Sequence, residues 1–331
     1  MTPFKLTALA AVSAIALGSI TTAADAQQLR LSHQWSTSDV RHQVAQMIAD
    51  ELEEADVGLS MRIFPSASLF SATEQYVPLS RGQLDMTVYP LSYAGGQRPE
   101  FNLTLMPGLV QNHDHGARLN ESPFMEALEE LMAEDDVMVL VHGYLAGGFG
   151  SADGCITRPE HMAGKTVRAA GRAFEQMLAA AGASISSMAS TEIYNGLQTG
   201  VLDAVNTSSA SFASFRLYEQ MECYTPAAEY ALWFMYQPLL MNKSRFESLS
   251  EEQQEALLAA AANAEAFYLE EAKAQDAASV EVFREAGVEI AEMTGEDFEI
   301  WRELAQESAY ADFLSQVPDG QRLLDLAFEV E

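Results

Sequence analysis

The feature that most limits the fold is a stretch in the last third of the chain, from Glu251 to Ala286, that has no glycine or proline. Ser250 and Gln253 form a capping-box pattern at its start, which predicts that a helix begins there. Apolar residues then recur at helical spacing, at Leu257, Ala261, Ala264, Tyr268 and Ala272. An unbroken helix of about 36 residues would be about 54 Å long at ~1.5 Å per residue, longer than a domain of about 150 residues is wide. We therefore expect this helix either to kink or to lie across two domains.

The first part of the chain alternates between strand and helix patterns, which predicts an α/β sheet architecture. Strands are predicted at residues 29–33, 59–64, 84–89 and 137–142, and helices at 39–52, 73–81 and 122–134. A second unit follows, with strands at 166–169, 185–188 and 204–206 and helices at 173–181 and 193–199. Between the two units, four of the eight residues from Gly143 to Gly150 are glycine. This segment is interpreted either as a flexible crossing between domains or as a tight turn near a ligand.

The N-terminus has the pattern of a secretory signal peptide. Lys5 gives a positive start, an apolar stretch covers residues 6–20, and Ala24-Asp25-Ala26 resembles a cleavage site. We expect residues 1–26 to be removed and the rest to be a soluble periplasmic protein; the alternative is an uncleaved anchor. The remainder of the 331-residue chain has the length of about two domains.

The charge balance limits the partners. With 48 acidic and 18 basic residues the net charge is −30, which repels nucleic acid and gives no general attraction to anions. An anion site would therefore have to be local. The chain is expected to be a monomer with no nucleic-acid partner.

Motifs for catalysis, cofactors or metals are not found. There is no H-E-x-x-H, C-x-x-C or G-x-S-x-G, and Pro159 stands where a phosphate-binding loop ending at Gly164 would need glycine. His113-Asp114-His115 is interpreted as a helix start rather than a metal site. The sequence thus predicts neither an enzyme nor a cofactor or metal site.

The two cysteines, Cys155 and Cys223, leave two possibilities open. An oxidising compartment would allow a disulfide between them. The alternative is a pair of unrelated buried thiols, because sequence does not show whether the two Cα atoms lie within ~7 Å of one another.

Several segments, taken together and in this order, resemble the substrate-binding subunits of TRAP (tripartite ATP-independent periplasmic) transporters, the DctP family. The resemblance covers essentially the whole chain after the signal segment. It rests on Phe64-Pro65 with Glu74, RGQLDM from Arg81 to Met86, TRPEHMAGKTVR from Thr157 to Arg168, Gly182-Ala183, TEIYNGLQTGVLD from Thr191 to Asp203, and Met241-Asn242-Lys243 followed by Phe246 and Leu249.

The resemblance implies a two-lobed fold like that of periplasmic binding proteins, with strands that cross at a hinge and a long helix that spans both lobes. Domain I would comprise residues 27–145 and 234–273. Domain II would comprise residues 146–233 and 274–331. Ligands of such folds bind at the carboxyl ends of the strands.

The resemblance also places Arg168 at the position of a ligand-binding arginine. A planar guanidinium presents parallel N–H donors that match a carboxylate. The sialic-acid-binding members carry a second arginine about 20 residues earlier, where this chain has Gly148-Phe149-Gly150. The other candidate contacts lie at strand ends or crossings. Asn206 and Thr207 could instead cap the end of a strand. Glu74 could instead be a charge at the start of a helix, and Trp233 an ordinary core residue. These candidates are Gln34, Trp35, Glu74, Tyr89, Tyr93, Phe149, Asn206, Thr207 and Trp233.

The function implied by the resemblance is capture of a small organic acid by closure of the cleft, followed by delivery to membrane permease subunits. The alternatives are a binding protein of an ATP-driven importer, a periplasmic enzyme and a ligand sensor that presents its solute to a receptor.

Overall fold

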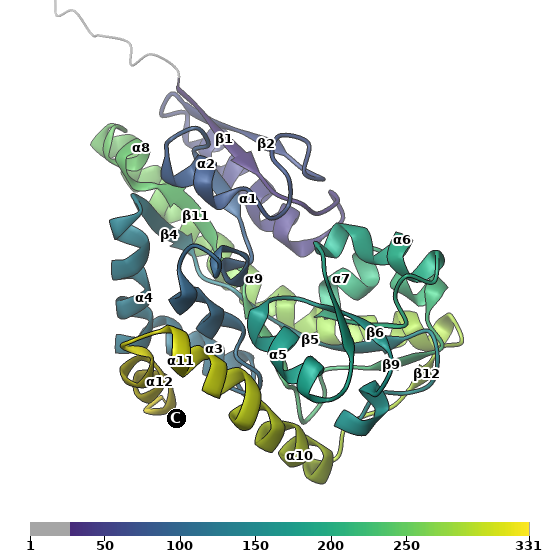
Figure 1. Ribbon diagram of the computed structural model, residues 1–331. Coiled ribbons are helices and arrows are strands. Elements are labelled where there is room, and N and C mark those ends of the chain that lie inside the picture. The colour runs from purple at the N-terminus through teal and green to yellow at the C-terminus, as the bar shows by residue number, and fades with distance from the viewer. Residues whose placement is uncertain (1–26, 331) are drawn as a thin grey trace, which may run out of the picture.

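The computed structural model describes residues 27–330, so the predicted signal segment at 1–26 lies outside the described residues. The described strands form two sheets (Figure 1). The five-stranded sheet has the order β2-β1-β3-β11-β4, and its strands are β1 Gln27–Ser32, β2 Leu59–Phe64, β3 Met86–Val88, β4 Val137–Val141 and β11 Leu239–Asn242. In it β1 runs parallel to β2 and β3, with Leu31 opposite Ile63 and Met86, whereas β11 is antiparallel to β3 and β4.

The seven-stranded sheet has the order β12-β9-β5-β8-β6-β7, and β10 pairs with β5. Its strands are β5 Tyr144–Ser151, β6 Thr166–Ala169, β7 Ser184–Ser187, β8 Ala204–Ser208, β9 Cys223–Thr225, β10 Trp233–Tyr236 and β12 Glu289–Ile290. Strands β6, β7 and β8 are parallel, as expected for the second α/β unit.

Helices cover both sheets. Those of the first unit are α1 Val40–Ala55, α2 Tyr76–Ser80, α3 His113–Asn120 and α4 Pro123–Glu134, and those of the second are α5 Arg172–Ala180, α6 Ile193–Gln198 and α7 Ser209–Ser214. We call the five-stranded sheet with α1–α4 the first lobe and the seven-stranded sheet with α5–α7 the second lobe. The predicted α/β architecture with two lobes is confirmed. None of the described helices combines the length and the apolar character needed to cross a membrane.

Two of the connections between strands carry the chain from one lobe to the other, and they are neighbours. One is residues 142–143, between β4 and β5, and the other is residues 237–238, between β10 and β11. The backbone N–H of Gln237 donates to the carbonyl of Gly143 at 2.8 Å, so the two crossings lie side by side.

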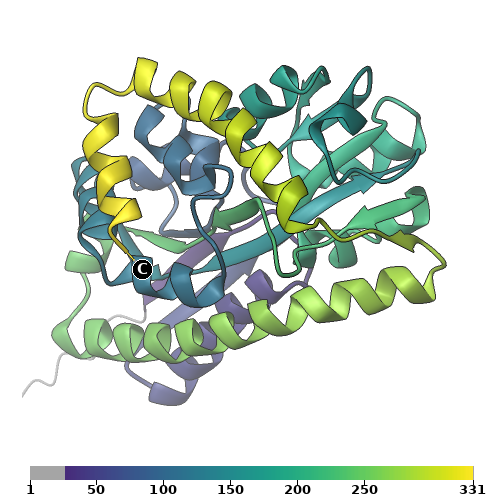
Figure 2. The same ribbon diagram turned by 90° about the horizontal axis from the view of Figure 1, so that it is seen from below.

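Helix α9, Glu251–Glu285, is continuous over 35 residues and begins at the predicted capping box. Its buried face includes Leu257, Ala261, Ala264, Tyr268 and Ala272, the residues with helical spacing in the sequence. It packs against α1 and β4 of the first lobe and against α7, β5 and β12 of the second. Figure 2 shows it running along the whole width of the molecule. Of the two expected arrangements, the helix therefore adopts the one that spans both lobes.

The glycine-rich segment corrects one interpretation of the sequence. Residues Tyr144–Ser151 form β5, a strand in which every residue is buried, so this part of the segment is neither flexible nor a turn, and only Gly143 lies in a crossing between the lobes. A Cβ at Gly147 or Gly148 would overlap the carbonyl oxygens of Thr207 or Thr225 on the adjacent strands, and one at Gly150 would overlap Met221. Glycine is needed here because neighbouring backbone and side chains approach too closely for a side chain.

A disulfide joins Cys155 and Cys223, whose Cα atoms lie 5.1 Å apart. It links the loop after β5 to the start of β9. Of the two possibilities that the sequence left open, the structure contains the paired form.

The chain ends in helices that run back along the molecule (Figure 2). They are α10 Gly295–Ala305, which continues through a π-helical turn at Gln306–Tyr310 into α11 Ala311–Gln316, and then α12 Gly320–Phe328. Helix α10 packs on α5 of the second lobe, whereas α12 packs on α4 of the first. The predicted residue boundaries of domains I and II stay a prediction. Helix α12 fits them least, because its residues fall in predicted domain II although it packs on the first lobe.

Candidate functional site

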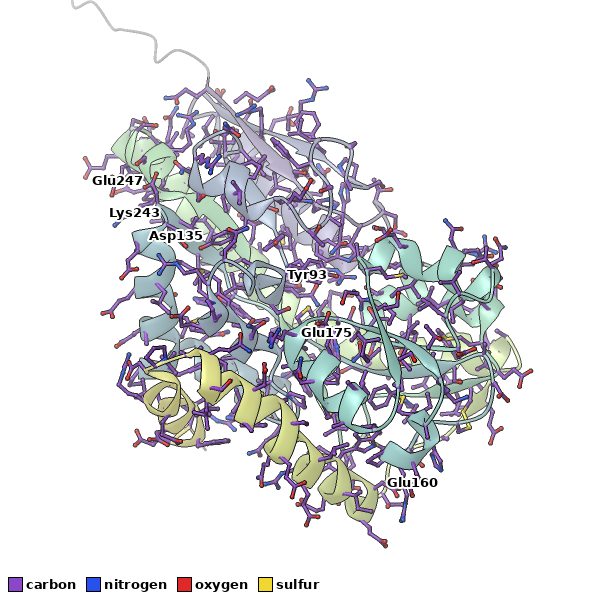
Figure 3. The ribbon with its side chains drawn as sticks, viewed as in Figure 1. Tyr93, Asp135, Glu160, Glu175, Lys243 and Glu247 are labelled. Atoms are coloured by element: carbon purple, nitrogen blue, oxygen red, sulfur yellow. A yellow bond between two sulfur atoms is a disulfide. The ribbon has the colours of Figure 1, made fainter. Side chains whose placement is uncertain are left out.

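A small cavity lies where the two lobes meet, and in this closed form its free space, about 10 Å³ for the centre of a water molecule, holds about one water. The first lobe lines it with residues that follow β1 and β3 and with the start of α1, and the second lobe with β6, β8, β10 and the segments after them. Figure 3 shows Tyr93 near the middle of the molecule, between the two lobes. The lining residues are Gln34, Trp35, Arg41, Pro90, Tyr93, Arg168, Ala170, Ser190, Thr207, Ser208, Ser211, Trp233, Met235 and Gln237.

Arg168 projects from β6 and is only 1% exposed. Its Nε donates to the carbonyl of Met188 at 3.0 Å, Nη1 to the carbonyl of Asn206 at 2.8 Å, and Nη2 to the hydroxyl of Tyr93 at 2.8 Å. A guanidinium has five N–H donors, so two remain, one on each terminal nitrogen. All three partners are neutral, and no carboxylate between residues 27 and 330 pairs with this guanidinium.

Arg41, a second buried arginine, lines the same cavity from the first turn of α1 and is also 1% exposed. Its Nε and Nη2 donate to the two carboxylate oxygens of Asp39, both at 2.6 Å. Its Nη1 donates to Oε1 of Gln237 at 2.9 Å, and its guanidinium carbon lies 3.9 Å from the ring centre of Trp35.

Asp39 is the N-cap of α1 and accepts from the backbone N–H of Arg41. Burial by itself would raise the pKa of Asp39, but the charge and hydrogen bonds of Arg41 outweigh burial and hold this pKa below its ordinary value. Asp39 is therefore ionised at neutral pH, and Arg41 and Asp39 form a buried ion pair.

Sequence reasoning missed Arg41, although a signal existed. A cation in the first turn of a helix is unfavourable because the helix dipole is positive at this end. An arginine there, two residues after an aspartate N-cap, indicates a specific partner.

Neutral donors complete the cavity wall. The Nε2 of Gln34 and the indole N–H groups of Trp35 and Trp233 are buried and have no hydrogen-bond partner among the described residues. The other end of the Gln34 amide, Oε1, accepts from the Ser190 hydroxyl at 3.3 Å. Because buried donors are nearly always hydrogen-bonded in native proteins, this group of three marks a place that suits acceptor atoms.

The structure brings six of the predicted residues to the cavity, namely Gln34, Trp35, Tyr93, Arg168, Thr207 and Trp233. Asn206 and Phe149 are opposite one another on β8 and β5, and cross-strand partners lie on the same face of a sheet. That face is the one away from the cavity, because Phe149 stacks on Trp301 of α10 with ring centres 5.4 Å apart. Asn206 therefore contributes its backbone carbonyl to Arg168 and not its amide to the cavity.

Glu74 and Tyr89 also lie outside the cavity. Glu74 is exposed and accepts a hydrogen bond from Ser71. Tyr89 is buried and donates from its hydroxyl to the carbonyl of Thr73 at 2.9 Å, so its polar end is already used. Phe149, Asn206, Glu74 and Tyr89 therefore do not line the cavity of this closed form, and their contact with a ligand stays a prediction.

Hydrogen bonds cross between the lobes around the cavity. Tyr93 accepts from Arg168, and Ser190 donates to Gln34. The hydroxyl of Ser214 donates to Asp39 at 2.8 Å. The lobes are thus in direct contact, and the structure is a closed form.

Comparisons with known proteins agree with this architecture. Residues 31–316 match the model of the family described as bacterial extracellular solute-binding protein, family 7. A solute-binding protein of Albidiferax ferrireducens is 34% identical over 310 residues, which are 92% of each chain.

Among solved structures, a TRAP periplasmic solute-binding protein from Rhodoferax ferrireducens, with bound malonate, superposes with a TM-score of 0.88. It is 33% identical, and the match covers 91% of this chain and 98% of that one. An extracytoplasmic solute receptor of Bordetella pertussis that binds pyroglutamic acid has a TM-score of 0.83 at 20% identity, covering 91% and 99%, and shares the fold.

Proposed function

Because the chain belongs to family 7 of the bacterial extracellular solute-binding proteins, we propose that its cavity captures a small organic acid and that the closed protein delivers this acid to the membrane permease subunits of a TRAP transporter. We propose further that residues 1–26 are a cleaved signal, that the mature protein acts in the periplasm as a monomer, and that nucleic acid is not a partner.

The proposal rests on the burial and the hydrogen-bond partners of Arg168. This guanidinium is buried in the interlobe cavity, is fixed by three neutral acceptors, and keeps one N–H on each terminal nitrogen. Two N–H groups on neighbouring nitrogens match the two oxygens of one carboxylate. The malonate and pyroglutamic acid of the two structural relatives are carboxylic acids as well.

Ligand capture would follow from closure of the lobes. In an open form the acid binds Arg168 on the second lobe. Contacts with Gln34 and Trp35 of the first lobe then exist only when the lobes close, so the acid favours the closed form by the free energy of these contacts. Closure also forms the direct bonds between the lobes, such as that from Ser214 to Asp39.

The proposal predicts that Arg168→Ala weakens binding of the acid by about 2–5 kcal/mol, or roughly 30-fold to several thousand-fold, because a buried carboxylate loses its charged partner. Isothermal titration calorimetry measures this change once a thermal-shift screen of carboxylates has identified a ligand. Arg284→Ala, which removes an exposed arginine of α9, is the matched control. An unchanged affinity in Arg168→Ala would remove this residue from the site.

The relatives found are solute-binding proteins, and none of the comparisons favours an importer driven by ATP or an enzyme. We propose that the bound acid undergoes no reaction. Incubation of the protein with the acid, followed by mass spectrometry, should return the acid unchanged, and a converted product would contradict the proposal.

A further inference from the structure

The charges around the cavity give information about the acid itself. The only charged side chains that line the cavity are Arg41 and Arg168, within the part of the chain that the structure describes. The two guanidinium groups are not equivalent, because their partners differ in charge.

The charge of Arg41 is already balanced. Both oxygens of Asp39 accept from it at 2.6 Å, and the carboxylate and the guanidinium are both buried. The remaining contacts of Arg41 are to the neutral side chains of Gln237, Ser208 and Ser211. All five N–H groups of Arg41 are used in these bonds, so Arg41 adds neither a free donor nor an unbalanced charge to the cavity wall.

The charge of Arg168 is not balanced. Its partners are two backbone carbonyls and one hydroxyl. The cavity thus has a net charge of one positive unit, located at the end where Arg168 lies. A buried charge is costly unless it is paired, so one carboxylate is the complement that this wall requires.

The rest of the wall is suited to neutral acceptors. The unpaired donors of Gln34, Trp35 and Trp233 can each bind a carbonyl, hydroxyl or amide oxygen. A second carboxylate placed near Gln34, Trp35 and Trp233 would be a buried anion without a counter-charge. The free space of the closed cavity holds only about one water, so it favours a small ligand.

We propose that the ligand is a small acid with a single negative charge, which places its carboxylate on Arg168 and a neutral acceptor near Gln34, Trp35 and Trp233. Asp39 sets this preference by cancelling the charge of Arg41. The inference rests on the proposed function and adds the charge class of the acid.

The test compares two molecules with the same number of non-hydrogen atoms, malonate and its half-amide malonamate, by isothermal titration calorimetry at pH 8. Succinate and succinamate form a second, longer pair. The half-amide is expected to bind at least tenfold more tightly than the dicarboxylate in the pair that fits. Equal or tighter binding of the dicarboxylates would overturn the charge inference and leave carboxylate capture intact. If none of the four binds but a larger acid from the thermal-shift screen does, the small size in this inference is wrong and carboxylate capture stands; if no carboxylate binds, both proposals fail.

A variant tests the role of Asp39 directly. Asp39→Asn keeps a residue type that is favoured at the N-cap, but it leaves Arg41 without a counter-charge. The ratio of malonate to malonamate affinity should then rise at least tenfold relative to the wild type. Asp50→Asn removes one charge from an exposed position of the same helix and should leave this ratio unchanged. An unchanged ratio in Asp39→Asn would overturn the role of Asp39, and the wild-type comparison remains decisive if this variant does not fold.

Discussion

At the scale of single residues, the two buried arginines show what a sequence can and cannot indicate. Arg168 was predicted as a ligand-binding residue because it ends the segment from Thr157 that resembles TRAP substrate-binding subunits. The structure places it in a cavity between the lobes. Arg41 lies 127 positions earlier, and only the folded chain brings it to the same cavity. Phe149 and Asn206 were candidates because of their positions in the family resemblance, and the sequence does not show which face of a buried strand a side chain occupies.

Next to the site, His33 has no exposed surface, and its Nε2 lies 3.0 Å from Nδ1 of His42. Burial and the neighbouring His42 lower the pKa of His33 to about 3. Since an unfolded histidine has a pKa of about 6.5, the unfolded state binds more protons at pH values between about 3 and 6.5. The stability contributed by the neutral ring is therefore complete above pH 6.5 and is lost as the pH falls toward 3.

We accordingly expect the unfolding free energy of the wild type to fall from pH 7 to pH 5, by up to about 2 kcal/mol from this residue. His33→Gln should reduce this fall, although it also lowers stability at pH 7. Urea unfolding at both pH values measures the difference, with His161→Gln at an exposed position as the control. The same pH dependence in His33→Gln and wild type would contradict the expectation.

At the scale of elements, the sequence was sufficient to predict α9 but not β5. A helix is a local structure, so its cap, its spacing and the absence of glycine and proline were sufficient to predict α9. The glycines of β5 serve contacts with β8 and β9, which are more than 50 positions away and could not be known from the local sequence. The same applies to the disulfide, because the distance between two Cα atoms depends on the tertiary fold.

Replacement of both Cys155 and Cys223 by serine should lower the unfolding free energy by about 2–4 kcal/mol. The disulfide closes a loop with a sequence separation of 68, and its loss increases the conformational freedom of the unfolded chain. Urea unfolding of the double variant under non-reducing conditions measures this effect. Ligand affinity at 25 °C should be retained, because neither cysteine lines the cavity. A variant as stable as the wild type would show that the disulfide is not a stabilising element.

At the scale of the whole molecule, the function depends on the equilibrium between open and closed lobes. The resemblance to a family implied two lobes, and the cap and apolar spacing predicted the long helix, but neither predicted a contact between the lobes. Ser214 shows the importance of such contacts, because it donates to Asp39 across the interface and yet does not line the cavity.

Ser214→Ala should therefore weaken ligand binding about fivefold without removing any ligand contact, since one hydrogen bond of the closed form contributes about 1 kcal/mol. Calorimetric titration with the identified acid measures the affinity. Ser315→Ala, on the exposed side of α11, is the control. If Ser214→Ala binds as tightly as the wild type, this contact does not contribute to closure.

Helix α9 has a consequence for how the molecule opens. It is packed on both lobes, and its Tyr268 fills the space beside Gly143, where one chain crossing passes from lobe to lobe. A rod fixed along both halves resists sliding and twisting far more than a small change in the angle between them. Opening of the lobes therefore has to bend α9 or release its packing on one of them.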